Sequence, residues 1–167
     1  MRKIRTIKEL LEIDVDLLNE NSVFKTDLIS DRNDTRNFLL FDLKSKFLEL
    51  FDQYQISMFD KEARHLEFRA SDYETSELEK LINLIVNEYG ADENDQSLSD
   101  WNTFKYMSWW FKNKNHEPTY DDYENTDDLH YGMMISEDET IGLIFSIVEY
   151  SNTDIKFNKI NWLQHCV

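Results

Sequence analysis

The apolar positions of the chain change their period several times, and these changes predict both helices and strands. The longest nearly unbroken apolar run is Ile141-Gly142-Leu143-Ile144-Phe145-Ser146-Ile147-Val148. Apolar residues occupy both alternating sets of this run, which is typical of a strand buried on both faces. We therefore predict a central strand at residues 141–148, with the rest of the chain supplying neighbouring strands and covering helices.

Helical spacing predicts three helices. Thr6-Ile7-Lys8-Glu9 has the form of a capping box, and the apolar residues that follow predict a helix over residues 6–19. A Phe-rich and Leu-rich stripe with a period near 3.6 predicts a longer helix over residues 35–55, after a polar connection at residues 20–37. The clearest amphipathic pattern runs over residues 78–89, behind a second capping box at residues 76–79, and Gly90 is placed to end this helix.

Alternating and β-branched patterns predict the strands. Residues 65–70 alternate strictly, so His65, Glu67 and Arg69 form the polar side of a half-exposed strand, with Glu67 and Arg69 as a surface ion pair of little energetic value. Residues 103–111 predict an aromatic strand in which Trp109 and Trp110 face opposite ways. Residues 129–135 and 155–162 predict two further strands, the last with a change of phase typical of a bulge.

This order of elements predicts one α+β domain over residues 1–167. Residues 1–60 are expected to be mainly helical, and residues 61–167 to form a strand, a helix and then strands. Short turns between the final strands favour a C-terminal antiparallel β-meander packed against the helices.

Composition supports a folded chain of unusual charge. The 167 residues carry a net charge of −16, yet 14% are aromatic, which is far more than in disordered acidic chains. Residues 1–50 hold 10 acids and 9 bases, so the remaining residues hold 24 acids and 9 bases, a net charge of −15. Such a field attracts a basic partner and argues against direct binding to nucleic-acid phosphates.

Segments for export or membrane insertion are not evident in the sequence. The basic start is not followed by an apolar signal core, and no window approaches the length of a transmembrane helix. Cys166 is the only cysteine, so no intrachain disulfide can form. We therefore expect a cytoplasmic protein without a membrane partner.

Searches for catalytic and metal-binding motifs return nothing specific. The four histidines lack metal-ligand spacing, and Cys166 next to His165 is too short a motif for a zinc site. There is no Gly-rich phosphate loop and no nucleophile elbow. We therefore expect no catalytic residue, no metal and no cofactor.

The best candidate for a binding site is the acidic loop over residues 112–128, because long ordered loops in compact domains are often functional. Tyrosines interleaved with carboxylates supply apolar area and partners for Lys or Arg, although a solvated loop that serves solubility is the competing interpretation. The candidate partner-binding residues are Glu117, Tyr120, Asp121, Asp122, Tyr123, Glu124, Asp127 and Asp128, together with Trp110 on the preceding strand.

The helix from Leu78 to Tyr89-Gly90, the acidic gap, the strand with Trp109-Trp110 and the hairpin that follows form a pattern over residues 63–150. This pattern resembles the strand–helix–strand–strand units of small acidic bacterial immunity proteins, the antitoxins of polymorphic or contact-dependent toxin systems. The resemblance implies an inhibitor that binds a basic toxin domain, often a nuclease, and blocks its active site or substrate groove.

Two other functions are compatible with the sequence. One is a phage-type DNA mimic whose carboxylates imitate phosphates and inhibit a restriction or CRISPR nuclease. The other is a small enzyme whose scattered carboxylate site cannot be recognised in one sequence. An inhibitor forms a stable, salt-sensitive complex, a DNA mimic competes with duplex DNA, and an enzyme turns over a substrate.

Overall fold

The computed structural model describes residues 3–11, 13, 15–29, 36–59, 62–112 and 130–149. The helices are α1 (Ile7–Leu11), α2 (Val15–Glu20), α3 (Thr75–Tyr89) and α4 (Trp101–Phe104), with a short 3₁₀ helix η1 (Leu98–Asp100) directly before α4. The strands are β1 (Ser22–Ile29), β2 (Arg36–Phe47), β3 (Phe51–Phe59), β4 (Glu62–Ala70), β5 (Tyr106–Lys112), β6 (His130–Asp138) and β7 (Gly142–Glu149).

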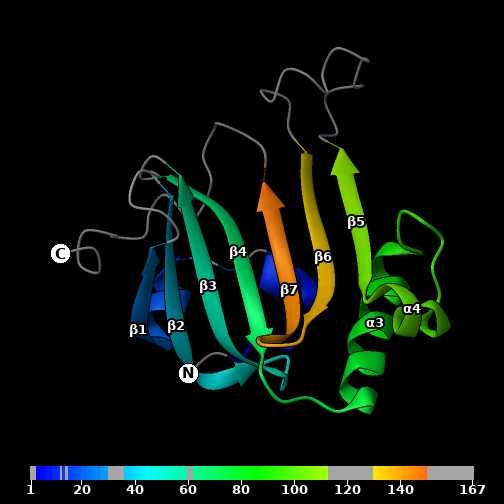
Figure 1. The fold of residues 1–167 in the computed structure, drawn as a ribbon, viewed down its shortest axis with the longest axis horizontal. Coiled ribbons are helices and arrows are strands. Elements are labelled where there is room, and N and C mark those ends of the chain that lie inside the picture. Colours follow the sequence, from blue (N-terminus) through cyan, green and yellow to red (C-terminus); the bar gives the residue numbers. More distant parts are fainter. Residues whose placement is uncertain are drawn as a thin grey trace.

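The described strands form one seven-stranded antiparallel sheet in the order β1-β2-β3-β4-β7-β6-β5 (Figure 1). Strands β1 to β4 follow one another as neighbours, and β5 to β7 form a second meander that joins β4 through β7. The expected α+β class and the C-terminal antiparallel meander are confirmed, although the sheet is larger than the sequence pattern predicts.

Strand β7 lies inside the sheet, between β4 and β6. Leu143 and Phe145 on one of its faces are fully buried, and Ile144 and Ser146 on the other are 9% and 6% exposed. The prediction of a strand buried on both faces is therefore confirmed, because even the polar Ser146 is buried.

The hydrophobic core lies on one face of this sheet, and the described helices pack against that face (Figure 1). Aromatic rings fill its centre, with Phe41 stacked on Tyr54 at 4.7 Å and Phe51 at 6.0 Å from Phe145. Apolar residues of α1, α2, α3 and α4 belong to the same core cluster. The opposite face of the sheet carries no described helix.

The prediction of a helix over residues 35–55 is wrong, because β2 and β3 occupy this stretch and residues 1–60 are therefore not mainly helical. Leu39 and Phe41 alternate into the core, as do their pairing partners Ile56 and Tyr54. The apolar residues are so dense that they satisfy a helical and an alternating period at once. Strand pairing decides between the two, as tertiary context does for ambiguous apolar runs.

Other boundaries differ in detail. The helix expected over residues 6–19 is divided into α1 and α2, but its capping box is confirmed: the Glu9 carboxylate accepts the Thr6 N–H at 3.1 Å and the Thr6 hydroxyl accepts the Glu9 N–H at 3.1 Å. The polar connection over residues 20–37 contains β1. The N-cap of α3 is Glu74 rather than Ser76.

The aromatic strand expected over residues 103–111 begins only at Tyr106. Residues 98–104 are helical, and Lys105 ends α4 in a left-handed conformation with φ 53°. Within β5, Trp109 enters the core and is 3% exposed, and its indole N–H donates to the Gly90 carbonyl at 3.0 Å. The strand predicted over residues 155–162 lies outside the described residues.

Candidate functional site

The binding loop predicted from the sequence lies outside the part of the chain that the structure describes. This holds for Glu117, Tyr120, Asp121, Asp122, Tyr123, Glu124, Asp127 and Asp128. Trp110 is located in β5, where its backbone pairs with Gly132, but its side chain is not among those described. The assignment of these residues to a partner site therefore stays a prediction.

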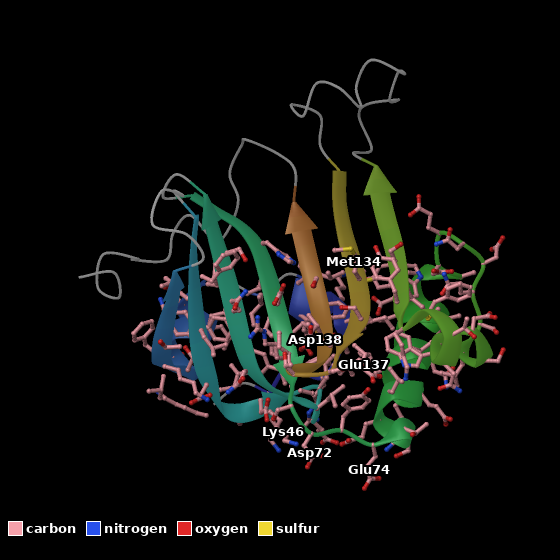
Figure 2. All side chains as sticks on the ribbon, in the orientation of Figure 1. Lys46, Asp72, Glu74, Met134, Glu137 and Asp138 are labelled. Atoms are coloured by element: carbon pink, nitrogen blue, oxygen red, sulfur yellow. The ribbon has the colours of Figure 1, made fainter. Side chains whose placement is uncertain are left out.

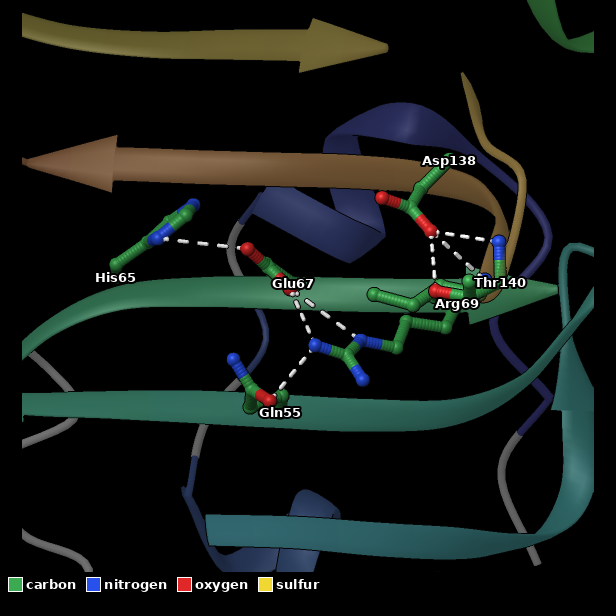
Figure 3. Close-up of polar contacts among 7 residues, drawn as sticks. Gln55, His65, Glu67, Arg69, Asp138 and Thr140 are labelled. Carbon is green, nitrogen blue, oxygen red and sulfur yellow. Dashed lines mark hydrogen bonds and ion pairs between the residues drawn. The ribbon is translucent and has the colours of Figure 1, made fainter. Parts of the chain in front are cut away.

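The face of the sheet that carries no described helix has a hydrogen-bonded polar network on β3 and β4 (Figure 3). The Arg69 guanidinium donates to Gln55 Oε1 at 2.7 Å and to Glu67 Oε2 at 2.9 Å. His65 Nδ1 lies 3.7 Å from Glu67 Oε1. Alternation along β4 turns His65, Glu67 and Arg69 to this face and Leu66 and Phe68 to the core.

The ion pair between Arg69 and Glu67 in this network is largely buried. The side chains of Arg69 and Glu67 are only 10% and 16% exposed, so the expectation of a surface ion pair is wrong. Gln55 accepts one of the remaining guanidinium protons of Arg69. Because each charge is paired, the network fixes the polar side chains of β3 and β4 rather than offering a free charge to a ligand.

His65 stands at the end of this network. Burial lowers the pKa of its imidazole, outweighing the opposite effect of the Glu67 carboxylate. Its Nε2 atom is buried and has no hydrogen-bond partner among the described residues. His65 is therefore neutral at pH 7.

A second surface lies at the β5 edge of the sheet, where two aromatic side chains are exposed. Phe104 at the end of α4 is 60% exposed, and Tyr106 at the start of β5 is 39% exposed. Both are held by ordered neighbours. The Lys105 N–H donates to the Trp101 carbonyl at 2.8 Å, Trp101 itself is buried, and the Tyr106 hydroxyl lies 3.1 Å from the Met134 sulfur.

A loop of acidic residues covers the outer edge of β5 next to these aromatic side chains. The buried Asp92 carboxylate organises it by accepting N–H groups from Asn94 at 3.2 Å and Gln96 at 2.6 Å. The Glu93 N–H donates to the Ser108 carbonyl at 2.8 Å, which fixes the loop to the strand. Residues 88–100 contain five acids and no base.

Two further carboxylates lie at the same end of the sheet, on the β6–β7 hairpin (Figure 2). Glu137 accepts the Tyr73 hydroxyl at 2.6 Å and the Lys105 ammonium at 3.1 Å, and these contacts hold its pKa below the usual value. Hydrogen bonds from Thr140 and Ile141 hold the pKa of Asp138 below its usual value in the same way. Both groups are therefore ionised at neutral pH.

The acidic loop and the two exposed aromatic side chains together form a surface that we call the acidic–aromatic edge. It is defined as Glu93, Asp95, Asp100, Phe104 and Tyr106. Exposed aromatic rings beside carboxylates match a partner surface that presents Lys or Arg with apolar stems. The sequence pattern missed this surface because residues 103–111 were assigned to a single strand. The capping sequence Ser97-Leu98-Ser99-Asp100 is the signal that indicates the helical turn before it.

The described residues show no sign of a metal site or a membrane-spanning helix. Among the described residues, no group of three or more His, Cys, Asp or Glu side chains is placed to hold a metal ion. No helix of the described part is long and apolar enough to cross a membrane. No protein-family model matches the chain, and comparisons with curated proteins and with solved structures find no significant similarity.

Proposed function

We propose that this protein is a non-catalytic acidic binding protein that neutralises a basic protein partner, as an immunity protein neutralises a toxin domain. The observation that carries the proposal is the acidic–aromatic edge, where Phe104 and Tyr106 are exposed beside a loop of carboxylates that is hydrogen-bonded to β5. A solvated acidic surface gains nothing from exposing two large aromatic rings at one place.

The charge and the aromatic side chains have separate roles in this proposal. A net charge of −16 accelerates the encounter with a basic surface, and this contribution falls as salt screens it. Phe104 and Tyr106 then supply the contact energy, because aromatic side chains dominate the few residues that carry most of the affinity in protein interfaces. The partner is expected to be a toxin domain, and a nuclease is one kind of basic toxin domain.

The alternative function of a DNA mimic, which would bind in the nucleic-acid channel of a nuclease, is less favoured. A phosphate mimic needs carboxylates in a phosphate-like spacing, whereas the described surface centres on aromatic rings. Competition with duplex DNA for the same partner distinguishes the two cases.

The experiment begins with tagged protein and an extract of the native host at low salt. Mass spectrometry then identifies any protein recovered at near-equal ratio. The recovered partner is purified, and its affinity is measured for the native chain and for the Phe104→Ala and Tyr106→Ala variants. We expect each variant to weaken binding by about tenfold or more, with an unchanged melting temperature.

Val23 on β1 provides the matched control. It is 57% exposed at the opposite edge of the sheet, so Val23→Ala removes exposed apolar area away from the acidic–aromatic edge. If the native chain and the Phe104→Ala and Tyr106→Ala variants bind the partner with equal affinity, the acidic–aromatic edge is not part of the interface. Tyr120→Ala and Tyr123→Ala test the loop at residues 112–128 in the same assay.

A further inference from the structure

A solvent-open notch of about 260 Å³ lies where the N-terminal segment meets the end of β2. The Leu48 N–H donates to the Ile4 carbonyl at 3.0 Å, and the Ile4 side chain is buried in the core. Ile4 thus anchors the segment while Lys3 and Arg5 on either side of it stay exposed. We call this site the basic notch, and its lining residues are Lys3, Ile4, Arg5, Ser45, Lys46 and Glu49.

Three cations of the basic notch, Lys3, Arg5 and Lys46, form no ion pair with another described residue. Lys46 precedes the buried Phe47 and is exposed, as are Lys3 and Arg5. The ion pairs of the described residues involve other bases, including Lys25, Arg69 and Lys105. Glu49 is the one carboxylate in the lining, so the notch has a net charge of +2.

The two chain segments that meet at the notch are also basic, in contrast to the chain as a whole. Residues 3–11 and 44–50 contain five bases and two acids, a net charge of +3, while the whole chain has −16. One of these acids, Glu9, is engaged in the capping box of α1 through the N–H groups of Arg5 and Thr6. The notch is therefore a local positive region on an acidic protein.

The backbone beside the notch is strained. Leu48 and Glu49 have φ values of 52° and 59°, and the Leu50 N–H closes the turn onto the Phe47 carbonyl at 3.0 Å. Turns with two such residues favour Asn and Gly, and residues with a Cβ adopt this conformation at a cost. Strain of this kind is concentrated at functional sites.

We propose that the basic notch binds the phosphate group of a small phosphomonoester. A phosphate carries nearly two negative charges and three acceptor oxygens. It therefore matches the three cations and the Ser45 hydroxyl that line this notch better than a single carboxylate would. This inference is independent of the proposed function, because the notch and the acidic–aromatic edge share no residue.

The test is a titration of isotope-labelled protein followed by two-dimensional amide NMR. The probes are inorganic phosphate, adenosine monophosphate and, as the dephosphorylated control, adenosine. We expect saturable shifts at the amides of residues 3–5 and 45–49 with both phosphate probes and none there with adenosine. Dissociation constants in the millimolar range are sufficient to observe this.

Three variants test how each charge changes the affinity of the notch for phosphate. Lys46→Gln weakens binding by about tenfold, the loss of one charge-assisted contact, whereas Glu49→Gln tightens it by removing the opposing charge. Lys25→Gln leaves it unchanged, because Lys25 is an exposed lysine paired with Asp42 on β2. Absence of saturable shifts, equal weakening by Lys46→Gln and Lys25→Gln, or equal shifts with adenosine would each overturn the proposal.

Discussion

A substitution at Phe145 tests the placement of β7 in the hydrophobic core. Phe145 is fully buried on β7, pairs with Phe68 on β4 and Ile135 on β6, and lies 6.0 Å from the ring of Phe51. The Phe145→Ala substitution removes the ring from a site closed by strands on both sides, so the core is unable to collapse into the space. We expect a loss of about 3–5 kcal/mol in the free energy of unfolding.

Urea denaturation followed by tryptophan fluorescence measures this loss. With a slope of about 2 kcal/mol/M, a loss of about 4 kcal/mol lowers the midpoint by about 2 M. Phe104→Ala is the matched control, since the same side chain is removed from a position that is 60% exposed, and we expect it to cost below about 1 kcal/mol. A loss below about 1 kcal/mol for Phe145→Ala would refute the placement of β7 in the core.

Further predictions concern the backbone, the polar network and pH. Gly142→Ala should destabilise by about 2–4 kcal/mol in thermal melts, because φ is +101° and a Cβ would lie 2.3 Å from a backbone oxygen of β4; an unchanged melt contradicts this packing. Arg69→Ala should cost about 3–5 kcal/mol by leaving Glu67 unpaired, and Arg69→Met combined with Glu67→Leu should recover most of it. Glu49→Gly should stabilise by about 1 kcal/mol through relief of the left-handed φ; a loss would contradict strain at this turn. Burial lowers the pKa of His65 from 6.5, so the unfolded chain takes up a proton that the folded chain resists. The free energy of unfolding should therefore fall as the pH drops below about 6.5, and His65→Gln should flatten that part of the profile.

The parts of the fold that sequence patterns predict are those with one unambiguous period. The buried residues of helix α3 follow one helical period, although Leu84 on the same helix is exposed. Strand β7 is apolar at both alternating sets of positions and is too short for a buried helix. The pattern over residues 35–55 fails because β2 and β3 are apolar at so many positions that both periods fit. The turn between these strands is formed by Leu48 and Glu49, which adopt positive φ values. Because this turn contains no Gly, Asn or Pro, the usual sequence signal for a turn is missing.

The candidate surfaces depend on tertiary structure in a different way. Periodicity places His65, Glu67 and Arg69 on one side of β4 correctly, but it gives no information on how deeply these side chains are buried. The exposure of Phe104 and Tyr106 depends on the left-handed Lys105, which turns the chain between α4 and β5. The basic notch joins residues 3–5 to residues 45–49, a contact between distant segments that local patterns do not reveal.

The most direct test of the proposed function is the affinity of the purified partner for the native chain and for a Phe104→Ala/Tyr106→Ala double variant, each at low and high salt. The account predicts a loss of about a hundredfold or more in the double variant at both salt concentrations, with native stability retained. It also predicts that high salt slows the association of the partner with the native chain and with the double variant by a similar factor, since the substitutions leave the charges unchanged. Equal affinity of the double variant and the native chain would contradict the claim that the acidic–aromatic edge binds the partner.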